Sequence, residues 1–120
     1  MKKKAKNVTI NKKKEFRYHD IEITNRRGRK IAIGHPAYIF LQKGNVYVYV
    51  SITHSNRVND YLLIKLKRNP NPKDDRDSYI VVDIKEDTKD QFGGLHKSWS
   101  LDPEDDELIR RLYDKIKKKR

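Results

Sequence analysis

Apolar and polar residues alternate along much of this chain, with the two-residue period of a β-strand. The alternation is clear in residues 16–24, and it returns at Ile31 and Ile33. Apolar runs follow, and the run at 46–52 is almost wholly β-branched or aromatic, which favours a strand. We predict five or six short strands, drawn from residues 16–24, 31–33, 37–41, 46–52, 61–66 and 79–84.

Turn-forming residues separate these strands. Residues 25–29 and 43–45 each contain a glycine, so both segments suit tight turns between antiparallel neighbours. Gly34-His35-Pro36 should interrupt regular structure, because proline restricts the backbone of the residue before it. Residues 67–78 hold two Asn-Pro pairs and predict an exposed loop, whereas 85–101 show no clear periodicity.

The C-terminal part of the chain has the pattern of an amphipathic helix. Asp102 can cap the first turn, and Pro103 suits the first helical position. Acidic residues at 104–107 and cations at 115–120 complement the two ends of the helix dipole. We predict a helix over 103–117, with an apolar stripe that covers an open face of the sheet and comprises Leu108, Ile109, Leu112, Tyr113 and Ile116.

Short antiparallel strands followed by one helix predict a mainly β protein. The expected architecture is a small antiparallel barrel, or a strongly bent sheet, with a C-terminal α-helix. The chain of 120 residues suits a single domain at 15–120, because two domains of half that length would be near the lower limit for an independent core.

The positive charge lies at the two ends of the chain. Residues 1–14 carry seven lysines and no acid, and residues 115–120 carry five cations and no acid. These twelve charges equal the net charge of +12, so residues 15–114 are formally neutral. We therefore predict a flexible basic arm at 1–14 and a basic tail, which give non-specific affinity for polyanions to a fold with a specific site of its own.

Composition excludes several classes of protein. The chain has no cysteine, and hence no disulfide framework, Cys-ligated zinc or thiol nucleophile. No apolar run approaches the roughly 18–20 residues of a membrane span, and the N-terminal lysines are not followed by the apolar segment of a signal peptide. The motifs of P-loop, dinucleotide-binding and zinc-protease sites are absent. We expect a soluble, cytoplasmic protein with no cofactor, no metal and no membrane contact.

Histidines at two strand ends are the candidates for chemistry. His35 precedes the strand at 37–41, and Thr53 and His54 follow the strand at 46–52. If residue 41 pairs with residue 46 across the turn, residue 35 lies opposite residue 52, at one rim of the sheet. We therefore predict a patch of His35, Thr53, His54 and Arg57, with Lys97 and Ser98 nearby.

Such a patch suits cleavage of an RNA backbone. A base takes the proton of the 2′-hydroxyl, an acid protonates the leaving 5′-oxygen, and a cation stabilises the charged phosphorane; histidine suits the first two roles. The same residues are also ordinary turn residues, and that structural reading stays open. Tyr47 and Tyr49 likewise fit either a base-stacking surface or the core.

Four motifs of the chain form a recognisable arrangement: Arg27-Gly28, His35-Pro36-Ala37-Tyr38-Ile39-Phe40-Leu41, Ser51-Ile52-Thr53-His54-Ser55 and Gly94-Leu95-His96-Lys97-Ser98. Over about residues 20–116 this arrangement resembles the MazF/PemK family of toxin ribonucleases. The Thr that ends the family's second strand corresponds to Thr53, and His35 stands where the family has an Arg before Pro. In the family, that Arg and that Thr are the principal catalytic pair.

This resemblance implies an SH3-like barrel that cleaves single-stranded RNA without a metal, forms a homodimer and pairs with an acidic antitoxin protein. The resemblance and the predicted patch together give His35, Thr53 and His54 as catalytic residues, with RNA or phosphate contacts from Arg29, Arg57, Lys97 and Ser98. Because histidine replaces the family's arginine, an alternative stays open. It is a non-catalytic nucleic-acid or protein-interaction module on a similar barrel, of the kind that a mobile element encodes. A small basic ribosome- or nucleoid-associated protein is a third reading, against which the neutral middle of the chain argues.

Overall fold

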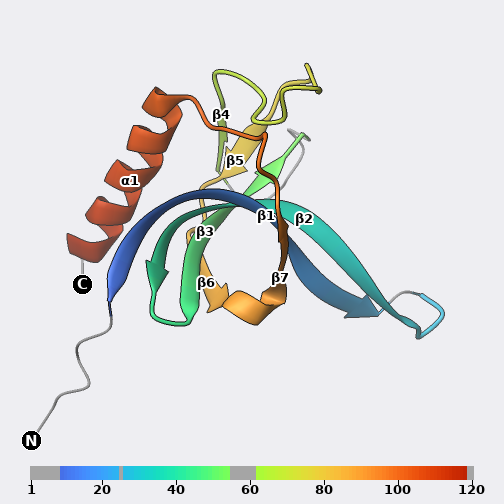
Figure 1. Ribbon diagram of the computed structural model, residues 1–120. Helices are drawn as coiled ribbons and strands as arrows, with labels where there is room; N and C mark the ends of the chain where they lie inside the picture. Colours follow the sequence, from blue (N-terminus) through green and yellow to red (C-terminus); the bar gives the residue numbers. More distant parts are fainter. Residues whose placement is uncertain (1–8, 25, 55–61, 119–120) are drawn as a thin grey trace, which may run out of the picture.

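The computed structural model describes residues 9–24, 26–54 and 62–118, and these residues form a mainly β protein with one C-terminal helix (Figure 1). The strands make one antiparallel sheet in the order β4-β5-β3-β2-β1-β7, with β6 on β3. The elements are β1 (Ile10–Thr24), β2 (Lys30–Lys43), β3 (Val46–Thr53), β4 (Leu63–Lys65), β5 (Tyr79–Val81), β6 (Lys85–Thr88), the short 3-10 helix η2 (Lys89–Gln91), β7 (Phe92–Leu95) and α1 (Pro103–Lys118).

The sheet curls on itself without closing. Strand β3 pairs with β6 over its first half and with β5 at its end, while β7 pairs with the far edge of β1. The curl therefore runs β6-β3-β2-β1-β7, and η2 connects its two ends (Figure 1). Among the described residues β6 and β7 are not hydrogen-bonded to each other, so the expected barrel is an open sheet.

Strands β1 and β2 are long, and this corrects two expectations. The prediction of a break at residues 34–36 is wrong, because β2 runs through them and Pro36 pairs with Tyr18 of β1. The prediction of a flexible arm is wrong for residues 10–14, which form the start of β1 opposite the end of β2. Cross-strand hydrogen bonds order these lysine-rich residues, although they contribute few apolar side chains. The rest of the predicted arm, 1–8, lies outside the described residues.

The hairpin of β2 and β3 has a different register from the one expected. Lys43 pairs with Val46 across a turn in which Gly44 has a φ of +56°, a value that favours glycine. A bulge at Phe40 then shifts the pairing by one residue, so Ala37 lies opposite Ser51. The expected pairing of residue 41 with residue 46 is wrong because the turn holds only Gly44 and Asn45, so Leu41 pairs with Val48. The bulge adds a further shift of one residue, which counting from the turn could not reveal.

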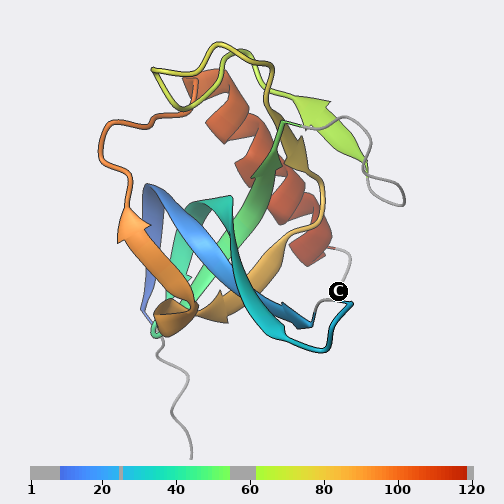
Figure 2. The ribbon, with the colours of Figure 1, turned by 90° about the vertical axis from the view of Figure 1, so that its right-hand side faces the viewer.

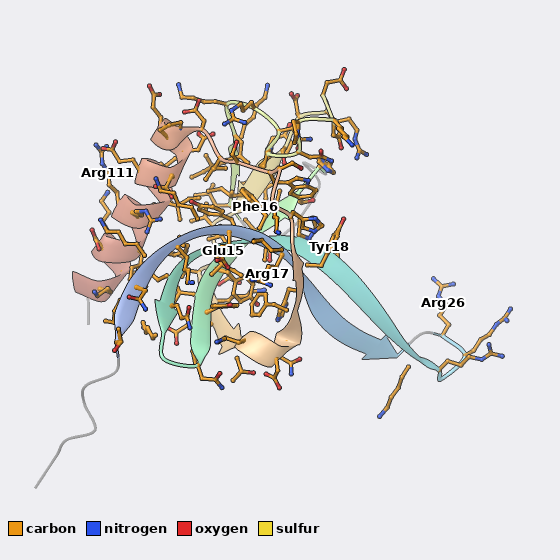
Figure 3. The ribbon with its side chains drawn as sticks, in the orientation of Figure 1. Glu15, Phe16, Arg17, Tyr18, Arg26 and Arg111 are labelled. Carbon is orange, nitrogen blue, oxygen red and sulfur yellow. The ribbon has the colours of Figure 1, made fainter. Side chains whose placement is uncertain are left out.

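Alternation along β1 separates two packed groups of side chains. Phe16 points toward α1 and the loops above the curl, whereas Glu15 and Arg17 point into the curl (Figure 3). The larger group, which we call the outer core, lies between the sheet and α1 (Figure 2). Its buried members are Phe16, Tyr38, Phe40, Val48, Val50, Ile52, Leu66, Ile80, Ile109 and Tyr113.

The smaller group, which we call the inner cluster, lies on the opposite face of the sheet, within the curl. It consists of the buried residues Ala37, Ile39, Tyr47 and Tyr49, with Phe92 packed against them. Tyr47 and Tyr49 are 6% and 3% exposed. Of the two readings of these tyrosines, the structure therefore supports the core and not a base-stacking surface.

Helix α1 confirms the sequence prediction closely. The Asp102 carboxylate accepts a hydrogen bond from the Glu104 amide at 2.9 Å, as expected of a helix cap. Asp106 accepts hydrogen bonds from the Tyr38 hydroxyl and from Arg110. Arg110 also donates to the carbonyl oxygens of Phe40 (2.8 Å) and Lys13 (2.7 Å), which lie at the bulge, so the helix satisfies groups that the irregular pairing leaves over.

Weakly patterned sequence accounts for the remaining differences. Strands β6 and β7 lie in residues 85–101, where the sequence shows no clear periodicity, and β5 is only three residues long. The loop at 67–78 contains no helix or strand, as predicted. Ile116, expected in the apolar stripe of the helix, is 41% exposed.

Candidate functional site

Two histidines lie directly opposite each other on β1 and β2. His19 and His35 are cross-strand partners, and side chains at such positions point to the same face of a sheet. His35 is exposed, whereas the His19 side chain is only 13% exposed. We call these two residues the histidine pair. It places a solvent-accessible imidazole, His35, across from an imidazole that the fold mostly covers, His19.

Both ring nitrogens of His19 have partners. Nε2 lies 2.8 Å from a carboxylate oxygen of Asp87 on β6, and Nδ1 lies 3.4 Å from the Tyr49 hydroxyl. A carboxylate only accepts hydrogen bonds, so Nε2 carries a proton, and in a neutral imidazole Nδ1 then accepts from Tyr49. The rings of Tyr49 and Phe92 pack on the imidazole, with centroids 4.9 and 4.8 Å away.

The protonation of this cluster follows from its contacts. The hydrogen bond from His19 lowers the pKa of Asp87, and the Thr88 amide adds to the effect, so Asp87 stays ionised. Burial, together with the charges of Asp87 and Asp83, raises the pKa of Tyr49 to about 12, so its phenol keeps its proton at neutral pH. A fixed donor, Tyr49, and a fixed acceptor, Asp87, therefore set the orientation of the His19 ring.

The other two predicted catalytic residues, Thr53 and His54, contact different elements. Thr53 pairs with Tyr79 of β5, because β3 leaves β2 after Ser51. By strand alternation Thr53 shares the face of Tyr49, as His35 shares that of Ile39. His54 turns instead to the loop at 67–78, where Nδ1 lies 3.2 Å from the Asp77 carbonyl oxygen and Nε2 lies 3.6 Å from Asp74.

The predicted phosphate-binding residues are spread over the fold. Arg29 is exposed in the turn between β1 and β2, which projects away from α1 (Figure 1). Lys97 and Ser98 are exposed in a turn that follows β7. Arg57 lies outside the described residues. The two described cations, Arg29 and Lys97, therefore lie in different turns, one between β1 and β2 and the other after β7.

Sequence reasoning missed His19, Asp87 and Tyr49 as a unit. One signal was present: His19 has the same parity as Ile21 and Ile23, so it continues an apolar alternation. A histidine at such a position is expected to face a packed interior. Asp87 gave no signal, because its strand has no hydrophobic pattern and reaches β3 only through the curl of the sheet.

Comparison of the chain with known protein families, curated proteins and solved structures gives no match. Among the described residues no group of three or more His, Asp or Glu side chains could hold a metal ion. No helix in the described part of the chain is long and apolar enough to cross a membrane. The functional argument therefore depends on the geometry of the histidine pair.

Proposed function

We propose that this protein is a MazF/PemK-like toxin, a metal-independent endoribonuclease that cleaves single-stranded RNA. The observation that carries the proposal is the histidine pair: an exposed imidazole, His35, directly across the sheet from an imidazole that Asp87 and Tyr49 hold in place. Acid–base cleavage of RNA needs groups that exchange protons near neutral pH, and histidine is the side chain that does so.

The reaction uses an internal nucleophile. His35 removes the proton of the 2′-hydroxyl, whose oxygen attacks the adjacent phosphorus, and the P–O bond to the 5′-oxygen breaks. Water supplies the proton that this oxygen needs, and the His35 imidazolium returns its proton to water, which leaves a 2′,3′-cyclic phosphate and a free 5′-hydroxyl. Thr53, on the same face by alternation, is suited to hold a phosphate oxygen through its hydroxyl. Charge stabilisation falls to Arg29 or Arg57, two of the cations predicted from the sequence, because Lys97 belongs to a separate turn that follows β7.

His19 acts as a positioning residue in this scheme. Its two nitrogens are occupied by protein groups, and its side chain is mostly covered. It fixes the distance between β1 and β6 at the place where His35 must meet the substrate. Its loss should therefore change the pH dependence and kcat of cleavage more than the affinity for RNA.

The SH3-like barrel remains part of this proposal. The curl β6-β3-β2-β1-β7 gives the five-stranded arrangement that such a barrel needs, and η2 spans its open side. A homodimer and an acidic antitoxin are the partners that the family resemblance implies, and the net charge of +12 favours an acidic protein partner.

RNA cleavage in EDTA, with analysis of the end groups, tests the proposal. A substrate with one 2′-deoxy residue at the cleaved position should resist cutting. His35→Ala should lose about 10²–10⁴-fold in rate, as for removal of a general acid or base, while RNA binding is nearly kept. His35→Arg restores the residue of the family. Arginine stays protonated and cannot act as the base, so retained or raised activity would show that residue 35 is the positional counterpart of the family's arginine and not the base, whereas lost activity supports His35 as the base.

Lys89→Ala is the control, because Lys89 is an exposed cation on η2 that belongs neither to the histidine pair nor to its hydrogen-bond partners. Its rate should equal that of the wild type. The interaction-module reading, which the replacement of arginine by His35 favours, predicts a different result. Under that reading, the wild-type and His35→Arg proteins both bind a broad RNA panel and cut none of it. This result would reject the proposal that the protein is an enzyme.

A further inference from the structure

Three aromatic rings gather on the outer face of β1, next to the turn that follows β7. The rings of His96 and Trp99 are stacked, with centroids 4.4 Å apart and planes 16° from parallel. Tyr18 packs its ring edge-on against His96, with centroids 4.7 Å apart. We call these three residues the aromatic turn; its hydrogen bond from the Trp99 amide to the His96 carbonyl is 3.2 Å long.

The aromatic turn is open to solvent and carries positive charge. The Tyr18 side chain is among the large hydrophobic groups left exposed, at 40%. Lys97 and Ser98 form the apex of the turn, and both are exposed. Residues 91–101 contain no acidic side chain, so the local charge favours an anion.

Packing alone does not explain the imidazole in this group. His96 Nε2 is buried and has no hydrogen-bond partner among the described residues. An unsatisfied buried polar atom is a cost that proteins usually avoid. A phenylalanine at this position would make similar ring contacts without that cost, so the choice of histidine points to a role other than filling space.

We propose that the aromatic turn binds an unpaired nucleobase, which stacks on the exposed tyrosine while Lys97 contacts its phosphate. Exposed aromatic rings beside a cation are how proteins hold single-stranded nucleic acid, because every base has a face that can stack. This site is separate from the histidine pair, since Tyr18 and His19 are neighbours in β1 whose side chains point to opposite faces. It does not rest on the nuclease proposal.

Trp99 provides the readout, because it is the only tryptophan in the chain. A base that stacks on the aromatic turn should quench its fluorescence in a saturable way. The probes are a single-stranded oligodeoxynucleotide and the matching uncleavable 2′-O-methyl RNA, and both should quench. The duplex of the same sequence should quench weakly, and inorganic phosphate alone should not quench.

Three variants test the residues. Tyr18→Ala should weaken binding roughly 5- to 150-fold, the usual effect of removing a stacking aromatic. Lys97→Ala should weaken binding and reduce the salt dependence by about one phosphate contact. Lys89→Ala, the matched exposed cation on η2, should change neither. Circular dichroism checks that Tyr18→Ala is folded, and Lys97→Ala serves as the test if it is not.

Two results would overturn the proposal. The first is binding detected by anisotropy with no change in Trp99 fluorescence. The second is quenching of the same size in Lys97→Ala, in a folded Tyr18→Ala and in the Lys89→Ala control. Cleavage is measured separately. If the protein shows the quenching but cuts no RNA, the base-binding site is supported and only the nuclease proposal is rejected.

Discussion

The two faces of the sheet are packed in different ways. The outer core combines ten buried residues of the sheet, the loops and the helix, and its polar side chains are mostly covered: Tyr38, Asp106 and Arg110 bond to one another and to backbone carbonyls. The inner cluster has four buried residues and Phe92. Its polar contacts join Tyr49, His19 and Asp87, and the last of these is 36% exposed.

This difference separates stability from chemistry. Polar groups of the outer core bond to one another and to the backbone of β1 and β2, so their role is to fix the helix on the sheet. Those of the inner cluster connect a buried phenol, through an imidazole, to a carboxylate that is partly exposed. Ionisable groups that a small core holds in place but does not seal are the ones that can act on a substrate. Four changes test this comparison, from the largest expected effect to the smallest.

Phe40→Ala should destabilise the outer core most. Phe40 is fully buried, with its ring centroid 5.6 Å from that of Tyr113 in the helix. Removing a buried phenylalanine costs about 3–5 kcal/mol of unfolding free energy, which urea denaturation measures. Leu62→Ala, at a residue 69% exposed, is the control and should change stability by less than about 0.5 kcal/mol. Similar costs for the two would show that the helix does not cover the main core.

Asp106→Ala should cause the next largest loss of unfolding free energy. It leaves the Tyr38 hydroxyl and the Arg110 guanidinium without their shared acceptor. Loss of one partner of a part-buried charged network costs roughly 1–3 kcal/mol. In a Tyr38→Phe background the same change should cost less, because one stranded donor is already gone. Equal costs in the two backgrounds would refute coupling through Asp106.

His19→Phe should have a smaller effect on stability and a clear effect on its pH dependence. Phenylalanine keeps the ring contacts with Tyr49 and Phe92, so we expect a loss of about 1 kcal/mol, in keeping with the loss of a partly exposed hydrogen bond. The pKa of Asp87 should rise toward its ordinary value, which carboxyl NMR titration measures.

The sign of this pH effect follows from the lowered pKa of Asp87. A lowered pKa in the folded state gives stability above the unfolded pKa, and that stability is lost as the pH falls through the folded pKa. The wild type should therefore lose more stability between neutral pH and about pH 3 than His19→Phe does. A variant that loses as much would show that the bond to Asp87 contributes nothing.

Asp105→Asn should give the smallest change in stability, and this change should be a gain. Burial raises the pKa of Asp105, so the folded protein favours the protonated carboxyl. Stability is therefore highest at low pH and falls as the pH rises through the folded-state pKa. Asparagine removes that loss and still accepts the bond that Asp105 takes from the Lys67 amide at 2.9 Å. Thermal unfolding should occur at a higher temperature at pH 7 and be unchanged at pH 3. A lower unfolding temperature at both pH values would instead show that the charge is needed.

The sequence by itself determined the elements whose signals are local. The cap at Asp102, the first-turn acids and the spacing of Ile109 and Tyr113 placed α1 almost to the residue. The β-branched and aromatic residues of 46–52 and the glycine at position 44 placed β3 and its hairpin turn. These signals depend on backbone angles and on neighbours a few residues away, so a sequence displays them directly.

Only the tertiary structure decided which residues meet. The bulge at Phe40 changed the register, β3 left β2 after Ser51, and the curl of the sheet brought Asp87 of β6 to His19 of β1. Thr53 and His54 were adjacent in the sequence, yet they lie against different elements. Each of these outcomes depends on the twist of the sheet and on contacts between residues far apart in the chain, which hydrophobic periodicity does not encode.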